Sequence, residues 1–321
     1  MKSTIFGSVC MFVVLCAMVA AAEVTGEAEI IFPEVAALSV GCFLAPRLVW
    51  RTSALRMILC IAVCAAGGVC IVRFVPLPLW AQFSLAFAVG QLVLFVSGTT
   101  FAPLISAIAL PVLIQTRSVV YIVAAVLLTS LVCLLRSFLV RAKIAERNEF
   151  SPVTFSERPT RAFFADFAFR TAFAALAAFF CIRFDARFCV APPLLVAFTE
   201  LTGKESKAAS RFWSVILLVS LCALSGAACR LVLSVQFTLP LTVSALVAGA
   251  CVILFVKIFA LPFPPAAAMA ILAMLIPPDA LVPYPLEVCA GIFVLSLAAH
   301  GWRAACKFFF KVAIVRLSHH F

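Results

Sequence analysis

The sequence predicts an all-α, polytopic membrane protein, and three observations carry this prediction. Hydrophobic residues make up 66% of the chain, charged residues only 12%, and the mean hydropathy is +1.23, whereas a soluble domain usually carries about 25% charged residues. Several apolar runs approach or exceed the roughly 18 residues that cross a bilayer as a helix. The basic residues gather between these runs, as topology signals do.

The apolar segments fall into two sets of six along the chain. The first set lies at 4–22, 31–45, 55–72, 78–97, 101–116 and 118–135, and the second lies at 162–182, 188–200, 212–229, 239–258, 263–277 and 284–300. We therefore expect a transmembrane bundle of two parallel-oriented repeats with about 10–12 membrane segments, some of them short, proline-broken helices. The predicted units are a first repeat at 1–140, a cytoplasmic linker at 141–161, a second repeat at 162–301 and a basic cytoplasmic tail at 302–321.

The first apolar run has two interpretations. It follows Lys2 and ends in Val-Ala-Ala-Ala-Glu, which resembles the small-residue cleavage site of a signal peptide. It also takes the place in the first half that residues 163–181 take in the second. This correspondence favours a retained first membrane span over a cleaved signal peptide.

The two halves share residues when the sequence is shifted by 162 positions. Over 74–114 against 236–276, 11 of 41 positions are identical, and chance in so apolar a chain gives about four. The shared positions are Leu77, Pro78, Leu79, Ala86, Ala88, Leu92, Phe101, Pro103, Leu110, Leu113 and Ile114. Because each half has an even number of segments, we expect the halves to point the same way, related by an axis along the membrane normal.

The basic residues also predict the orientation. If every segment crosses and the N-terminus is cytoplasmic, 18 of the 24 basic residues lie inside. The outer side then holds five, which are Arg73, Arg117, Arg183, Arg187 and Arg230. This asymmetry predicts a multi-pass protein of the inner (plasma) membrane with both termini in the cytoplasm. Two short segments that dip into the membrane and return to the same side would leave the longer spans with the same orientation.

The short segments that carry proline are the candidate substrate site. Paired, interrupted segments at matching positions point to a transporter's binding site, because a broken helix exposes backbone donors and a positive N-terminal end that favours an anion. The alternative is that proline simply starts a short helix at its first turn, where it is well tolerated. The predicted lining residues are Pro33, Glu34, Pro103, Ser106, Pro192, Pro193, Pro264 and Pro265.

Charged residues inside the apolar segments are few. Asp166 and Arg170 lie four apart on one helical face, which predicts a structural ion pair, with a role in a permeation path as the alternative. Glu34, Glu200 and Glu287 lie near segment ends. A proton-coupled transporter needs a carboxylate of this kind, although interfacial glutamates are more often simply hydrated.

Other function classes receive no support from the sequence. The fourteen cysteines mostly lie inside apolar runs without metal-ligand spacings, and no nucleophile motif, phosphate-binding glycine loop or zinc signature occurs. We expect no enzyme activity, no cofactor and no metal. The net charge is +11, but the basic residues cluster between the apolar runs, where they set membrane topology. We therefore expect no nucleic-acid partner.

Residues 188–300 carry a family resemblance. They contain Pro-Pro-Leu-Leu-Val-Ala-Phe at 192–198, a polar loop from Lys204 to Arg211, Phe-Pro-Pro-Ala at 263–266 and Tyr-Pro-Leu at 284–286. This order resembles the HPP family of integral membrane proteins, usually described as four-helix transmembrane bundles, and it makes the first half a degenerate copy. Some members are associated with nitrite transport. Here Phe263 replaces the motif histidine and Ala267 stands where glycine is common.

The sequence thus predicts a transporter or channel-like protein for a small solute, with a small anion such as nitrite as the candidate. The expected partners are the lipid bilayer, the solute and a second copy in a homo-oligomer. The alternative is a structural or interaction protein that packs against another subunit, which predicts a closed, dry centre. A lipid-modifying membrane enzyme would need clustered carboxylates or histidines at one interface, and the sequence lacks them.

Overall fold

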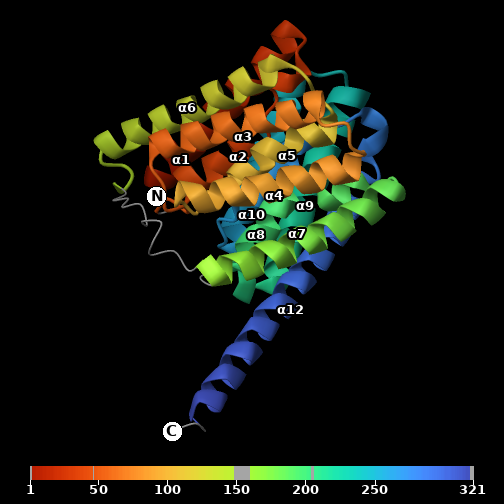
Figure 1. The fold of residues 1–321 in the computed structure, drawn as a ribbon. Helices are drawn as coiled ribbons and strands as arrows, with labels where there is room; N and C mark the ends of the chain where they lie inside the picture. The colour runs from red at the N-terminus through yellow and green to blue at the C-terminus, as the bar shows by residue number, and fades with distance from the viewer. Residues whose placement is uncertain (1, 46, 148–159, 204–205, 319–321) are drawn as a thin grey trace.

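The computed structural model confirms an all-α polytopic bundle (Figure 1). It describes residues 2–45, 47–147, 160–203 and 206–318, and side chains at 5–45, 47–147, 163–203 and 206–308. No strand occurs in these ranges. Twelve α-helices are described, joined by short 3-10 and π-helical turns. Most of the polar linker, residues 148–159, lies outside the described chain.

Eight of the described helices are long and apolar enough to cross a bilayer, so the protein is a multi-pass membrane protein. They are α1 (Lys2–Thr25), α3 (Ala54–Phe74), α4 (Leu79–Ser97), α6 (Val119–Arg141), α7 (Thr160–Arg183), α9 (Phe212–Cys229) with its π-helical end η6 (Arg230–Gln236), α10 (Leu241–Phe259) and α12 (Tyr284–Ser318). Their outer faces carry large exposed side chains such as Leu55, Leu127 and Phe138, which suits contact with lipid tails.

Four short helices lie inside the ring of long ones. They are α2 (Glu34–Ser39), which continues into the π-helical turn η2 (Val40–Leu44), α5 (Pro103–Ile114), α8 (Pro192–Thr202) and α11 (Pro264–Leu272). Helix α2 packs on α11 and α8 packs on α5, so each contact joins the two halves of the chain. Helices α3 and α4 cover α5, and α9 and α10 cover α11. The centre of the molecule is therefore built from short helices of both halves.

Helix α1 belongs to the core. It packs against α10, α2 and η2, and its side chains Met11, Leu15 and Met18 are fully buried. The Glu23 carboxylate accepts hydrogen bonds from the backbone N–H groups of Leu241 and Thr242, which caps the start of α10. Helix α1 is therefore packed as a core helix of the described bundle.

Two helices run further than the apolar pattern predicts. Helix α6 continues to Arg141 and α12 continues to Ser318, so the predicted basic tail at 302–321 is largely a continuation of α12, which projects from the bundle (Figure 1). The N-terminus, the end of α6 and the start of α7 lie toward the same end of the bundle. Hydropathy marks the apolar part of a helix and does not mark where its hydrogen bonding ends.

Two glycines allow long helices to approach the short ones closely. A Cβ at Gly68 of α3 would lie well inside van der Waals contact of the Ile108 carbonyl oxygen of α5. A Cβ at Gly226 of α9 would meet the Ala270 carbonyl oxygen of α11 in the same way. Small residues at helix interfaces let backbones pack closely in membranes, where dispersion contacts replace the hydrophobic effect between helices.

Replacing either glycine with alanine should destabilise the protein. We expect Gly68→Ala and Gly226→Ala each to cost about 1–3 kcal/mol, because the backbone carbonyl opposite cannot yield to the added methyl group. Gly301→Ala in the exposed part of α12, where nothing lies within 4 Å of the new Cβ, should be neutral or stabilising. Thermal unfolding in detergent measures the difference, and equal behaviour of all three variants would contradict the close-approach interpretation.

Candidate functional site

The prolines start the short helices, and they leave no free donors there. Pro103, Pro192, Pro193, Pro264 and Pro265 occupy the first turn of their helices, where proline has no N–H to offer. The next N–H groups of these turns are already bonded. Those of residues 105, 194 and 266 each donate to the carbonyl three residues before, at 2.8–3.1 Å. The backbone donors at the starts of α5, α8 and α11 are therefore already bonded in this conformation, and anion binding at the short-helix starts stays a prediction.

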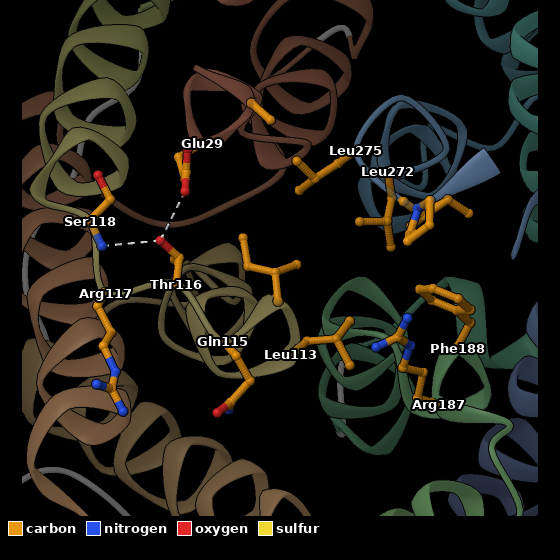
Figure 2. Close-up of a pocket in the computed structure, with 14 residues that line it drawn as sticks. Glu29, Leu113, Gln115, Thr116, Arg117, Ser118, Arg187, Phe188, Leu272 and Leu275 are labelled. Carbon is orange, nitrogen blue, oxygen red and sulfur yellow. Dashed lines mark hydrogen bonds between the residues drawn. The ribbon is translucent and has the colours of Figure 1, made fainter. Parts of the chain in front are cut away.

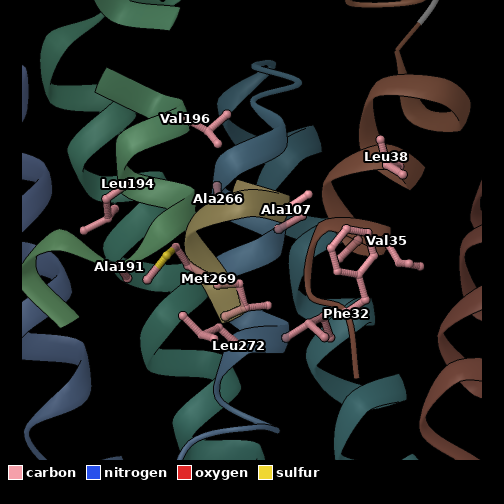
Figure 3. Close-up of a cluster of buried hydrophobic side chains, with 14 of the residues drawn as sticks. Phe32, Val35, Leu38, Ala107, Ala191, Leu194, Val196, Ala266, Met269 and Leu272 are labelled. Carbon is pink, nitrogen blue, oxygen red and sulfur yellow. The ribbon is translucent and has the colours of Figure 1, made fainter. Parts of the chain in front are cut away.

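The space between the short helices is closely packed. Ala107, Ala191, Ala266 and Met269 are buried and point toward one another from α5, α11 and the start of α8 (Figure 3). Phe32 and Val35 of the α2 region complete this cluster. The predicted lining prolines therefore lie beside a dry, apolar contact in this conformation.

One polar pair interrupts the apolar centre. Glu34, the first residue of α2, is only 1% exposed, and its Oε1 accepts a hydrogen bond from the Ser106 hydroxyl of α5. Its Oε2 is buried without a hydrogen-bond partner. The structure thus brings two of the predicted lining residues together across 72 positions of sequence. The hydrated, interfacial interpretation of Glu34 is wrong, because the flanking segments cover it.

The two tyrosines of the chain each supply a donor to a short helix. The Tyr121 hydroxyl of α6 donates to the Ala107 carbonyl at 3.0 Å, and the Tyr284 hydroxyl of α12 donates to the Met269 carbonyl at 2.5 Å. Ala107 lacks its usual donor because residue 111, four positions later, is a proline inside α5. Met269 lies in the last turn of α11, where carbonyls have no intrahelical donor. The two rings also contact Phe32 and Phe188 edge to face.

A cavity of about 510 Å³ opens between the turns that lead into the short helices α2 and α8 and the ends of the short helices α5 and α11 (Figure 2). We call it the vestibule. It is lined by the turns η1 (Ala28–Ile30) and η4 (Arg187–Val190), which precede α2 and α8, and by the ends of α5 and α11. Its apolar wall includes Leu113, Phe188 and Leu272. Its volume lies within the range of small-ligand sites.

The charged groups of the vestibule are two arginines and one glutamate. Arg117 and Arg187 line it together with Glu29. Glu29 accepts a 3.4 Å hydrogen bond from the Thr116 hydroxyl, and the Arg187 guanidinium also lies over the Phe188 ring. The two arginines and the glutamate together give the vestibule a net charge of about +1. The distribution of basic residues along the sequence predicts that the vestibule opens on the outer side of the membrane.

Two further arginines bind the backbone at the ends of α5 and α11. Arg73 Nε donates to the Arg117 carbonyl at 2.8 Å, and Arg230 Nη1 donates to the Ala273 carbonyl at 2.6 Å and to the Ile276 carbonyl. Helix C-terminal ends carry partial negative charge. These guanidinium groups therefore offset the negative ends of α5 and α11 where they border the vestibule.

The predicted ion pair lies away from the centre. Arg170 Nη2 is 3.9 Å from Asp166 Oδ2, while its Nε donates to the Thr202 hydroxyl at the end of α8 at 2.6 Å. Asp166 accepts a 2.7 Å hydrogen bond from the Trp302 indole of α12. These contacts link α7 to α8 and α12, which agrees with the structural role predicted for the ion pair.

The sequence did not identify the tyrosines or the vestibule arginines as site residues. The sequence did contain a signal for the tyrosines. The chain has only two, and they are 163 positions apart, which is close to the 162-residue shift that aligns the two halves. Glu287 accepts a 2.9 Å bond from the Phe188 N–H, and Glu200 accepts a 3.2 Å bond from the Trp50 indole. Within the described residues, no group of three or more His, Cys, Asp or Glu side chains could hold a metal.

Comparisons with protein-family models, curated proteins and solved structures give no match to this chain. The resemblance to the HPP family therefore stays a hypothesis. The chemistry of the site is argued from its own geometry, in which an electropositive vestibule lies above a packed centre with one buried carboxyl group.

Removing either tyrosine hydroxyl should destabilise the bundle. We expect Tyr121→Phe and Tyr284→Phe each to cost about 1–3 kcal/mol, because each leaves a buried carbonyl without its donor. Phe184→Leu, a change at a side chain that is 74% exposed, is the matched control. Melting temperatures in detergent check this, and a Tyr121→Phe protein as stable as the control would show that Ala107 has another donor.

Proposed function

We propose that this protein is a transporter for a small solute, and that the solute is a small anion that enters through the vestibule. The observation that carries the proposal is the vestibule itself. It is lined by the turns that lead into α2 and α8 and by the ends of α5 and α11, and it holds Arg117 and Arg187 against the single carboxylate of Glu29. A cleft lined by one sign of charge raises the local concentration of the opposite ion.

The arrangement of the short helices supports a path through the centre. Helices α2 and α8 begin beside the vestibule, and α5 and α11 end there, so any solute that leaves the vestibule for the far side must pass between them. Their mutual contact is closed by alanine, leucine and methionine side chains. We assign this closed packing to a state in which the vestibule is open and the opposite side is sealed.

We propose further that the two halves are parallel repeats, as alternating-access transporters often are. Matching contacts support this. Helix α1 packs on α10 as α7 packs on α4, and α2 packs on α11 as α8 packs on α5. Gly68 matches Gly226, Tyr121 matches Tyr284 and Arg73 matches Arg230. A pair of such halves can rock against each other around a shared centre.

The resemblance to the HPP family makes nitrite the first anion to test, in a plasma membrane with both termini in the cytoplasm. The site residues in this proposal are Arg117 and Arg187 at entry, followed by Glu34 and Ser106, with Pro33, Pro103, Pro192, Pro193, Pro264 and Pro265 shaping the short helices. We place no enzyme activity in this site.

The closed centre also favours a second candidate function. A dry, packed interior is what a structural or interaction protein would have, and Ala107, Ala266 and Met269 are fully buried. Such a protein would pack its lipid-facing helices against a partner subunit. The vestibule is the observation that this alternative leaves unexplained.

Ligand-dependent unfolding of the purified protein tests the proposal. The panel is nitrite, nitrate and formate as anions, with urea and glycerol as neutral solutes. A ligand at 100 times its Kd should stabilise the protein by about 2.7 kcal/mol. A shift with one or more anions and none with the neutral solutes is the expected outcome. No shift with any anion at saturating concentration would favour the interaction protein.

The vestibule arginine gives a site-specific prediction. We expect Arg187→Gln to raise the Kd for the stabilising anion about tenfold or more, because it removes a charged partner of a bound anion. Arg183→Gln is the matched control, since Arg183 is exposed at the end of α7 and does not line the vestibule. Equal loss of affinity in both variants would indicate a general surface-charge effect and remove Arg187 from the site.

A further inference from the structure

Glu34 and Ser106 form a polar pair that only one half of the molecule possesses. Helix α8 begins at Pro192 where α2 begins at Glu34, 158 positions earlier, and the 162-residue shift that aligns α5 with α11 places Ala268 opposite Ser106. Both Pro192 and Ala268 are buried. The packing of these short helices therefore does not require a carboxyl group at this position.

The carboxyl group of Glu34 has few partners in its closed surroundings. One oxygen accepts from Ser106 and the other has no partner. No ion pair within 4.0 Å involves Glu34 among the described residues. Burial of an ionised carboxylate with so little compensation is costly. The closed packing is therefore suited to the neutral acid.

The groups that face Glu34 from neighbouring elements do not supply a charge. Helix α11, which covers α2, contains no titratable residue, and α5 contributes the Ser106 hydroxyl. Tyr121 of α6 is a further titratable group that faces Glu34, and its hydroxyl donates to the Ala107 carbonyl.

The remaining charged or titratable residues nearby are turned elsewhere. Arg136 of α6 binds the Cys42 and Glu146 carbonyls. Glu23 of α1 caps α10. The thiols of Cys42 in η2, Cys64 in α3 and Cys10 in α1 are buried and carry no positive charge.

We propose that Glu34 is the proton-binding site that couples transport to the proton gradient, an inference that rests on the proposed function. When the centre is open toward the vestibule, the carboxylate takes a proton from a hydronium ion on that side, forming an O–H bond and leaving water, and the centre closes around the neutral acid. When the centre opens to the opposite side, the acid releases its proton to a water molecule there and becomes a carboxylate, as a free glutamate does at neutral pH. Each cycle thus carries one proton with the solute.

A proton fits this site better than a metal cation. Sodium or calcium would need about six oxygen ligands, whereas the site offers the side-chain oxygens of Glu34 and Ser106. A bound proton needs only one carboxyl oxygen. The unpartnered Oε2 of Glu34 is the atom that would carry it.

Infrared spectroscopy of the full chain in liposomes tests the site without reference to any solute. At neutral pH, the C=O stretch of a protonated carboxylic acid should be present in the wild type and in Glu200→Gln, and absent in the double variant Glu34→Gln/Glu200→Gln. Glu200→Gln is the background for this comparison because Glu200, in the last turn of the short helix α8, is a second carboxyl group with one neutral donor, Trp50. Ser106→Ala should keep the band and shift its frequency. A band that is missing in Glu200→Gln, or that survives in the double variant, overturns the proposal.

Uptake of nitrite into the same liposomes tests the coupling, with protein-free liposomes as the correction for passage of nitrous acid. An acidic exterior should raise wild-type and Glu200→Gln uptake about tenfold over equal pH, and Glu34→Gln should lose this response. Uptake that ignores the pH gradient overturns the coupling and leaves the proposed transport standing. No uptake by the wild type of nitrite, nitrate or formate overturns the proposed function and the coupling with it, while the infrared band still decides whether Glu34 holds a proton.

Discussion

The fold depends on one constraint, which is that backbone polar groups inside a membrane need partners within the protein. Four helices of this bundle start or end among packed helices, where water cannot satisfy their N–H and C=O groups. Prolines at the starts of α5, α8 and α11 remove donors that would have no partner. Tyr121, Tyr284, Arg73 and Arg230 supply donors to carbonyls in or just beyond α5 and α11. The short helices are stable because nearly every terminal group is either absent or bonded.

This arrangement also explains why the centre is poor in polar groups. Once the prolines and tyrosines satisfy the backbone, the helices can pack through alanine and glycine at short distances. Any polar side chain left in that contact has to be compensated locally. Glu34 is compensated only in part, by Ser106, and the proposed repeat places proline and alanine opposite these two residues. A partly satisfied buried group is a reason to look for function there.

The electrostatic character of the molecule divides between its surface and its centre. We propose that anions are attracted by the vestibule arginines, which line a cavity. The next backbone donors at the starts of α5, α8 and α11, one of the two interpretations of the prolines, are already bonded within their helices. The buried carboxyl group of Glu34 is acidic and suits a proton. The proposed anion vestibule and the proposed proton site together have the chemistry of proton-coupled anion movement.

The sequence by itself determined the class of protein and most of its helices. A chain with 66% hydrophobic residues has almost no alternative to spanning helices in a bilayer, because only helices satisfy the backbone within one segment. Prolines at 103, 192 and 264 likewise marked where short helices begin, since the ring fixes the backbone and removes a donor locally. Only the tertiary structure decided that Glu34 is buried, that Ser106 lies beside it, and that Arg117 and Arg187 share one cavity. Those facts depend on contacts between residues about 70 positions apart, and burial and pairing are properties of neighbours that no local pattern encodes.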